Sequence, residues 1–169
     1  YLRAVVYSSV LRLAIQFREF EWTEKYIEEY SKKLEPDHRD NMFYYSNAFL
    51  SFAKGQFEKC LQYAAKVNFN TFQMKYYLRD LQLCAHYELS HFESALSLID
   101  AYKHFIKKEN NYSPELKQGY LNFIGYTLEL IKIKLGSEGT DIGDLKNRIN
   151  GSHTMRQQWL LDKASELEA

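Results

Sequence analysis

Apolar residues recur every three or four positions along most of the chain, which is the spacing of an amphipathic helix. The clearest case is residues 41–67, where two such segments flank a short turn that contains Gly55. Phe57 follows this glycine two residues later. A glycine in a tight connection between two helical segments indicates an antiparallel helical hairpin. We therefore expect an all-α fold with no sheet.

Two sets of aromatic positions recur with a period of 35 residues, one before and one after each predicted turn. They are Phe17, Phe52 and Tyr87 before the turn and Trp22, Phe57 and Phe92 after it. A hairpin that repeats at a fixed period leaves one face uncovered unless neighbouring copies stack on it. Three hairpins are therefore predicted, over residues 2–35, 41–68 and 72–109.

The repeated residues resemble those of the tetratricopeptide repeat over residues 1–110. The matching positions are Ala48, Gly55, Phe57 and Cys60 in the middle copy, Phe92 and Ala95 in the third, and Trp22 and Pro36 in the first. The departures are Leu13 and Leu83 in place of a small residue and Lys25 in place of an alanine. The resemblance implies a right-handed superhelical solenoid of α-α hairpins. No ligand-binding residue of a characterised repeat domain carries over.

After the hairpins, the sequence predicts a long helix over residues 113–135, which begins at Ser113 with a proline and an acid in the first turn. A short helix and a last helix are expected within residues 141–168. Thr154 to Gln157 fits a capping box for the last helix. Trp159 and Leu160 would let that helix cap the solenoid. Residues 1–169 are thus predicted to form one domain.

Several positions are predicted to be buried because they recur on the faces where helices meet. These are Phe57, Leu61, Tyr87 and Ile99, with Cys60 and Cys84 as reduced core thiols of a cytoplasmic protein. Pro36 is expected to end the second helix, and Asp37 or Asp40 to cap the third. The chain begins at Tyr1 without a methionine, so we expect it to be a fragment of a longer protein.

The charge and motif content argues against several function classes. Lys plus Arg and Asp plus Glu are equal at 22 each, which does not favour nucleic-acid binding. No apolar run approaches the roughly 18 residues of a membrane span. Phosphate loops, nucleophile elbows and zinc motifs are absent from the sequence, so we expect no enzyme, cofactor or metal. Cys84 and His86 lie on different faces of a helix and do not form a chelating pair.

A polar stripe also repeats along the first helix of each hairpin. Its three rows are Ser9, Tyr44 and Arg79; Arg12, Asn47 and Gln82; and Gln16, Ser51 and His86. One interpretation is that each of these helices simply needs a solvated side. The other is a recognition surface, whose candidate partner-binding residues are Arg12, Tyr44, Asn47, Arg79, Gln82 and His86.

Two functions are consistent with these features. The first is a non-enzymatic scaffold that binds a protein or peptide partner through the surface of the first helices. The alternative is a structural C-terminal domain that packs against its own chain or forms a homodimer. Light scattering separates them, because a concentration-independent monomer argues against self-association.

Overall fold

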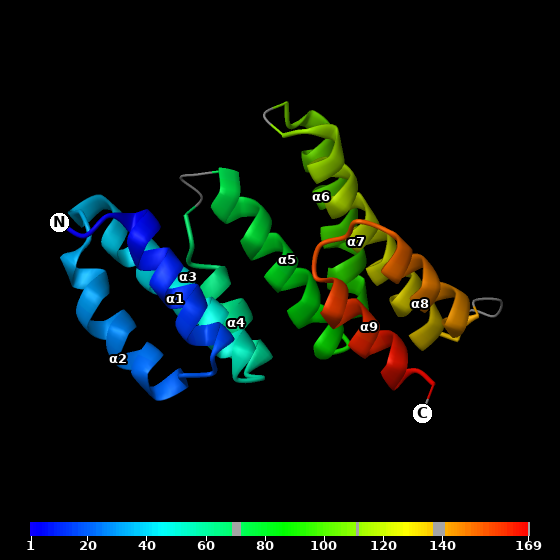
Figure 1. Ribbon diagram of the computed structural model, residues 1–169, viewed down its shortest axis with the longest axis horizontal. Coiled ribbons are helices and arrows are strands. Elements are labelled where there is room, and N and C mark those ends of the chain that lie inside the picture. Colours follow the sequence, from blue (N-terminus) through cyan, green and yellow to red (C-terminus); the bar gives the residue numbers. More distant parts are fainter. Residues whose placement is uncertain (69–71, 111, 137–140, 169) are drawn as a thin grey trace. The chain divides into compact units, whose positions relative to one another are not determined.

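The computed structural model describes residues 1–68, 72–110, 112–136 and 141–168, and all regular structure in them is helical (Figure 1). Within these ranges the one strand-like pairing is an isolated parallel bridge between Leu2 and Leu34. The all-α prediction is confirmed for the described residues. The elements are α1 (Ala4–Gln16), α2 (Phe20–Tyr30), the 3-10 turn η1 (Ser31–Lys33), α3 (Pro36–Ala53), α4 (Phe57–Ala64), α5 (Phe72–Glu88), α6 (Phe92–Lys108), α7 (Pro114–Lys134), α8 (Ile142–Gly151) and α9 (Gln157–Glu166).

The chain divides into two compact units. Unit 1 is Tyr1–Ser90, with α1 to α5, and unit 2 is His91–Ala169, with α6 to α9. The boundary falls in the tight turn after α5, which is the turn of the third predicted hairpin. The organisation of residues 1–169 as a single domain stays a prediction.

The same backbone conformation recurs at the three tight turns that follow α1, α3 and α5. Arg18, Gly55 and Ser90 have φ values of 60°, 72° and 57°, in the left-handed region that favours glycine. The next residue of each turn has ψ close to 61–65°, and a phenylalanine then begins the following helix. These phenylalanines are Phe20, Phe57 and Phe92.

This geometry corrects the register of the first predicted hairpin. Phe20, and not Trp22, is the counterpart of Phe57 and Phe92, so the first spacing is 37 residues and the second 35. The sequence pattern missed the shift because Arg18 provides the left-handed residue without a glycine to mark it. A shift of two residues turns a helix by about 200°, since each residue adds about 100°.

The core of unit 1 lies between the hairpins α1–α2 and α3–α4 and extends to α5. Tyr7 is central to it. Its ring stacks on Tyr26 at 5.1 Å, and Tyr26 stacks in turn on Trp22 at 4.9 Å and on Tyr30 at 4.8 Å. The Tyr7 hydroxyl lies 3.1 Å from Ser46 Oγ of α3. The stack joins α1 to α2, and the hydroxyl contact of Tyr7 adds α3.

The burial predictions are confirmed in part. Tyr87 and Ile99 are fully buried, whereas Phe57 and Leu61 are half-buried and pack against the rim of the core. Cys60 and Cys84 are buried free thiols, as expected.

Unit 2 is built on α7, which packs against α6 and α9, while α8 packs against α9. Ser113 caps α7 as predicted, because its Oγ accepts a hydrogen bond from Leu116 N at 3.2 Å. Near the middle of α7, Gly119 O accepts from Met155 N at 3.2 Å. A methyl group at Gly119 would lie 2.9 Å from side-chain atoms of His153 and Met155, so these side chains would have to move to admit it.

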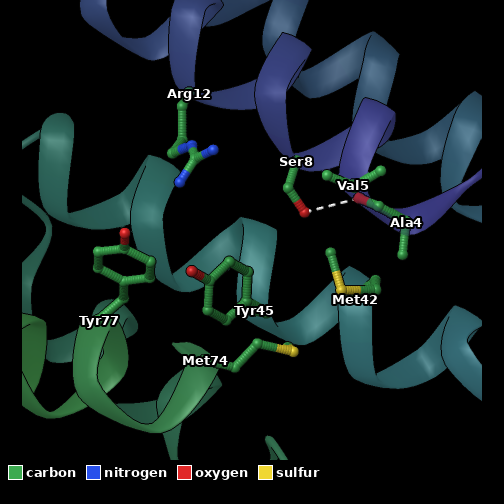
Figure 2. A pocket seen from close by; sticks show the side chains of 8 residues that line it. All are labelled: Ala4, Val5, Ser8, Arg12, Met42, Tyr45, Met74 and Tyr77. Carbon is green, nitrogen blue, oxygen red and sulfur yellow. Dashed lines mark hydrogen bonds between the residues drawn. The ribbon is translucent and has the colours of Figure 1, made fainter. Parts of the chain in front are cut away.

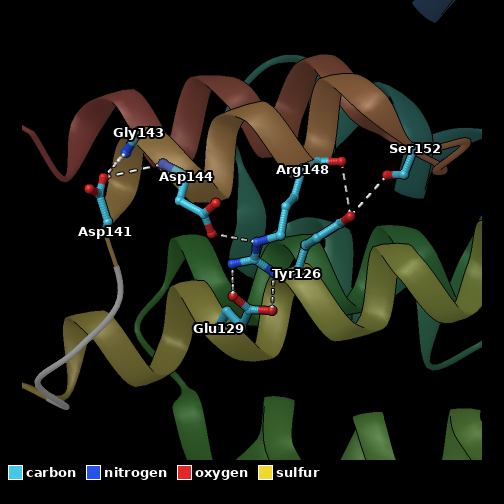
Figure 3. Close-up of polar contacts among 7 residues, drawn as sticks. All are labelled: Tyr126, Glu129, Asp141, Gly143, Asp144, Arg148 and Ser152. Carbon is cyan, nitrogen blue, oxygen red and sulfur yellow. Dashed lines mark hydrogen bonds and ion pairs between the residues drawn. The ribbon is translucent and has the colours of Figure 1, made fainter.

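A polar network ties α8 to α7 (Figure 3). The guanidinium of Arg148 donates to both carboxylate oxygens of Glu129, at 3.0 and 2.7 Å, and to Asp144 at 2.8 Å. These hydrogen bonds raise the pKa of Arg148. The Tyr126 hydroxyl lies 3.0 Å from both Arg148 O and Ser152 Oγ. The side chains of Tyr126, Glu129 and Arg148 all form hydrogen bonds in this network, which links α7 to α8.

The second helix ends before Pro36, as expected, since α2 ends at Tyr30. Pro36 is also the first residue of α3, because a proline fits the first turn, where its missing N–H is not needed. Two other helix-end predictions are wrong. Neither Asp37 nor Asp40 caps α3, since its N-cap residue is Glu35. The N-cap of α9 is Arg156 with φ 53°, and no side chain caps it, so the capping box at Thr154 does not form.

Candidate functional site

An open groove of about 250 Å³ lies among α1, α3 and α5, the first helices of the predicted hairpins. Figure 2 shows its lining side chains, with Arg12 of α1 and Tyr77 of α5 facing each other and Tyr45 of α3 between the helices. The lining is mostly apolar and aromatic. The residues are Ala4, Val5, Ser8, Arg12, Met42, Tyr45, Met74 and Tyr77.

The groove uses equivalent positions of the three helices. Val5, Met42 and Tyr77 each lie 13 residues before the left-handed residue of the following turn, at 18, 55 and 90. Three of the eight lining residues thus occupy equivalent positions relative to the recurring turns. These residues were not predicted as a site because apolar and aromatic residues at helical spacing indicate core, and because the two-residue shift hides the equivalence of Val5.

Arg12 is the charged residue among the described lining side chains of this groove. Its guanidinium carbon lies 5.9 Å from the centre of the Tyr77 ring, within the range of a cation–π contact. No carboxylate of the described residues forms an ion pair with Arg12. The hydroxyl of Ser8 donates to Ala4 O at 2.8 Å and so is already engaged. Arg12 thus presents an uncompensated positive charge beside an apolar bed.

A second hollow of about 270 Å³ adjoins the groove and shares Ala4 and Val5 with it. Leu2 and Leu34, which form the isolated bridge, also line it. Its charged residues include Arg3 and Glu35, and the Nε2 atom of His38, which also lines it, lies 3.8 Å from Glu35 Oε2. Arg3 has no ion-pair partner among the described residues.

Of the six predicted partner-binding residues, Arg12 lies in the groove. Tyr44 lies about 200° around α3 from Met42, and its ring meets the ammonium of Lys66 at 5.3 Å. Asn47 donates to Phe43 O of its own helix at 2.9 Å. Both side chains are half-buried on a face of α3 that turns away from the groove.

The three predicted residues on α5 are also outside the groove lining. Arg79, Gln82 and His86 are half-buried, and Arg79 is turned about 200° from Tyr77 around the helix axis. Because the first copy is shifted by two residues, Arg12 does not share a helix face with Tyr44 and Arg79. Whether the five residues outside the groove bind a partner stays a prediction.

A further apolar surface runs along the outside of α1. We call it the outer stripe, and on an ideal helix its residues fall within an arc of about 60°. Leu13 and Phe17 are 54% and 72% exposed. The stripe consists of Val6, Val10, Leu13 and Phe17.

Comparisons with models of protein families, with curated proteins and with solved structures found no match. No helix among the described residues is long and apolar enough to cross a membrane. In the same part of the chain, no three His, Cys, Asp or Glu side chains are grouped as ligands for a metal ion.

Proposed function

We propose that unit 1 is a helical-repeat interaction module, similar in design to tetratricopeptide repeats, and that its groove binds a segment of another polypeptide. The observation that carries this proposal is the equivalence of Val5, Met42 and Tyr77, which line one groove from three successive first helices. Repeat proteins commonly use the surface formed by equivalent helices to bind extended partners. The protein would act as a non-enzymatic scaffold.

The chemistry of the lining suits a large apolar anchor from the partner. Met42 and Met74 have flexible side chains that adapt to an incoming group, while Tyr45 and Tyr77 offer rigid aromatic faces. Tyr77 and Arg12 are of the residue types that contribute most to interfaces. Neither net charge nor a basic surface favours nucleic acid as the partner. The buried free thiols fit a cytoplasmic setting.

Two adjacent valines provide a matched test. Val5 lines the groove and is 62% exposed, whereas Val6 is 47% exposed and belongs to the outer stripe. Peptides selected from a random displayed library against the full chain should lose affinity at least about tenfold for Val5→Glu. They should bind Val6→Glu almost normally. Circular dichroism should show both variants folded.

Cross-linking locates the bound peptide independently. A photoreactive phenylalanine analogue at position 77 should capture the selected peptides, whereas the same group at position 59, an exposed site on α4, should not. Equal capture from both positions, together with equal binding by the two valine variants, would refute the groove as the docking site.

The outer stripe favours self-association as a second candidate function. Pairing of two α1 helices about a twofold axis would place Val6 beside Phe17 of the other copy and Val10 beside its Leu13. The exposed apolar area of the stripe is on the order of 300 Å² per copy. Twice this area is below the roughly 1,200 Å² of a stable interface, so the dimer would be weak and concentration-dependent.

Light scattering after size exclusion tests this second candidate. Leu13→Glu should abolish any rise in mass with concentration, while Leu135→Glu, at a similarly exposed leucine of unit 2, should not. A constant monomer mass for the unmodified chain up to about millimolar concentration would rule out this weak dimer.

A further inference from the structure

The turn geometry relates the outer stripe of α1 to faces of α3 and α5 that are buried. Counted from the left-handed residue of each turn, Leu13 corresponds to Leu50 in α3 and to Ala85 in α5. Leu13 is 54% exposed, whereas Leu50 and Ala85 are 3% and 0% exposed. Val6 differs in the same way from its counterpart in α5, Leu78, which is fully buried. The stripe is therefore an open copy of a face that is buried in the later hairpins.

In α5 this face is covered by the hairpin that precedes it. Leu78, Leu81 and Ala85 belong to the core cluster of unit 1, and the other buried residues of that cluster all precede α5 in the chain. On an ideal helix the three residues fall within an arc of about 60°. The helix α5 contacts both members of the preceding hairpin, α3 and α4. The apolar face of α5 is thus closed by the helices before it.

In α3 the corresponding face meets the first hairpin. Ser46 is the counterpart of Leu81, and its Oγ lies 3.1 Å from the Tyr7 hydroxyl of α1. Leu50 follows four residues later, about 40° around the helix from Ser46. It belongs to the same core cluster as Tyr7 and as Ile27 of α2. Since α3 contacts both α1 and α2, the face equivalent to the outer stripe is occupied by preceding helices in both later copies.

The charge around the outer stripe indicates which helix fits it. Residues 1–18 contain three arginines and no aspartate or glutamate. The helix α2, which packs against α3, is acidic, with four glutamates and one lysine. Its Glu24 forms an ion pair with Lys54 in the turn after α3, and the turn after α1 carries the exposed Arg18. A helix with acidic flanks therefore complements α1, whereas a second copy of α1 brings like charges together.

We propose that the outer stripe docks an acidic amphipathic helix of another polypeptide, which lies on α1 as α4 lies on α5. The docked helix presents apolar residues at i, i+4, i+7 and i+11, the spacing of the stripe itself. Acidic residues beside this seam approach Arg18 at the end of α1. The surface is distinct from the groove, because the groove lining contains none of the stripe residues. The small exposed area makes the complex a transient one.

Synthetic helical peptides test the proposal. Two fluorescein-labelled peptides of about 18 residues have leucines at i, i+4, i+7 and i+11 in a background of alanine and glutamine. One carries glutamates beside the leucines and the other carries lysines at the same places. A third has the composition of the acidic peptide, with its leucines spread around the helix. Binding to the full chain is measured by fluorescence anisotropy at low and high salt.

The three peptides should differ in a defined order. At low salt the acidic peptide should bind at least about fivefold tighter than the lysine peptide, and the difference should shrink at high salt. The peptide with dispersed leucines should show no measurable binding, because it has no apolar seam to place on the stripe.

Two exposed apolar residues of α1 provide matched variants. Leu13→Ser removes an apolar side chain from the outer stripe, and Val5→Ser removes one from the groove lining. Both side chains are more than half exposed, at 54% and 62%, so circular dichroism should show both variants folded. Leu13→Ser should weaken the acidic peptide at least about tenfold, whereas Val5→Ser should leave its affinity unchanged. Arg18→Gln should weaken it about twofold at low salt.

The results separate the possible occupants of the stripe. Binding of the acidic peptide that persists in Leu13→Ser would place the helix elsewhere and overturn the proposal. Failure of the acidic peptide to bind would also overturn it. A mass that then rises with concentration in the unmodified chain, but not in Leu13→Ser, would identify a second copy as the occupant. The groove is tested separately by Val5→Glu, so its failure and the failure of this proposal are distinguishable.

Discussion

Tyr7 connects α1 to α2 and α3, and its hydroxyl should give unit 1 a specific sensitivity to alkaline pH. The side chain is fully buried, and burial raises its pKa to about 12 from the usual 10. Ser46 Oγ donates to Met42 O at 2.6 Å, so the Tyr7 hydroxyl donates to Ser46 Oγ. The folded state thus favours the neutral phenol.

The direction of the pH effect follows from this preference. Below about pH 10 the phenol is neutral in both states and the stability is complete. As the pH rises from about 10 to about 12, the unfolded chain ionises first, and the free energy of unfolding falls by about 1.4 kcal/mol per pH unit. The loss near pH 12 is therefore about 2 kcal/mol, reduced from the full value because half of the folded molecules are then ionised.

Tyr7→Phe is the informative perturbation because it removes the titrating group and keeps the ring. At about pH 8 the variant should be less stable by about 1 kcal/mol, for the lost hydrogen bond. Near pH 11 the two proteins should become equally stable, and above it the variant should be the more stable one. The pKa of Tyr26 is also raised by burial, but Tyr26 is present in both proteins, so the comparison isolates Tyr7.

Urea unfolding followed by tryptophan fluorescence provides the assay. In a Trp159→Phe background the remaining tryptophan is Trp22, which stacks on Tyr26 in unit 1. Transition midpoints at a series of pH values give the stability difference between the two proteins. A difference that stays constant from about pH 8 to about pH 12 would refute the burial of the Tyr7 hydroxyl.

Three further predictions concern unit 2. Gly119→Ala should lower the stability of unit 2 by about 1–3 kcal/mol through the contact with His153. Gly125→Ala, with open space around it, should instead stabilise α7 by up to about 1 kcal/mol. Thermal unfolding should therefore give a lower melting temperature for Gly119→Ala than for Gly125→Ala. Arg148→Gln should lower the free energy of unfolding by about 1 kcal/mol at low salt and by less in about 1 M NaCl. A loss of stability that does not change with salt would indicate a packing effect in place of the ion pair. Ser113→Ala should cost about 1 kcal/mol in urea unfolding, and an unchanged midpoint would mean that its hydroxyl does not cap α7.

Much of the fold could be predicted because local signals and packing agree. The start of α7 at Ser113 and the turn at Gly55 are marked by residues whose backbone and side-chain preferences have few alternatives. The turn at Arg18 could not be located in this way, because Arg18 adopts a positive φ, a conformation that is not expected of a residue other than glycine. The N-cap at Arg156 was missed for the same reason.

The candidate site could be predicted only where the 35-residue spacing between helices was correct. Tyr44 and Arg79 share a register with each other, since the turns after α3 and α5 are 35 residues apart. Arg12 belongs to the shifted copy and so lies in the groove without them. The apolar lining could not be distinguished from core by sequence, because Met42 and Tyr45 are of the residue types expected inside. Their partial opening to a groove depends on how three helices pack.

The stacked rings of Tyr7, Tyr26, Trp22 and Tyr30 also have an optical consequence. Aromatic side chains held in one chiral arrangement give circular dichroism in the near ultraviolet, and this signal disappears when fixed tertiary packing is lost even if helices persist. Unit 1 carries four such rings with centroid separations of 4.8–5.1 Å between neighbours. The protein therefore contains its own label-free reporter of whether α1 and α2 are packed together, separate from the far-ultraviolet signal of helix content.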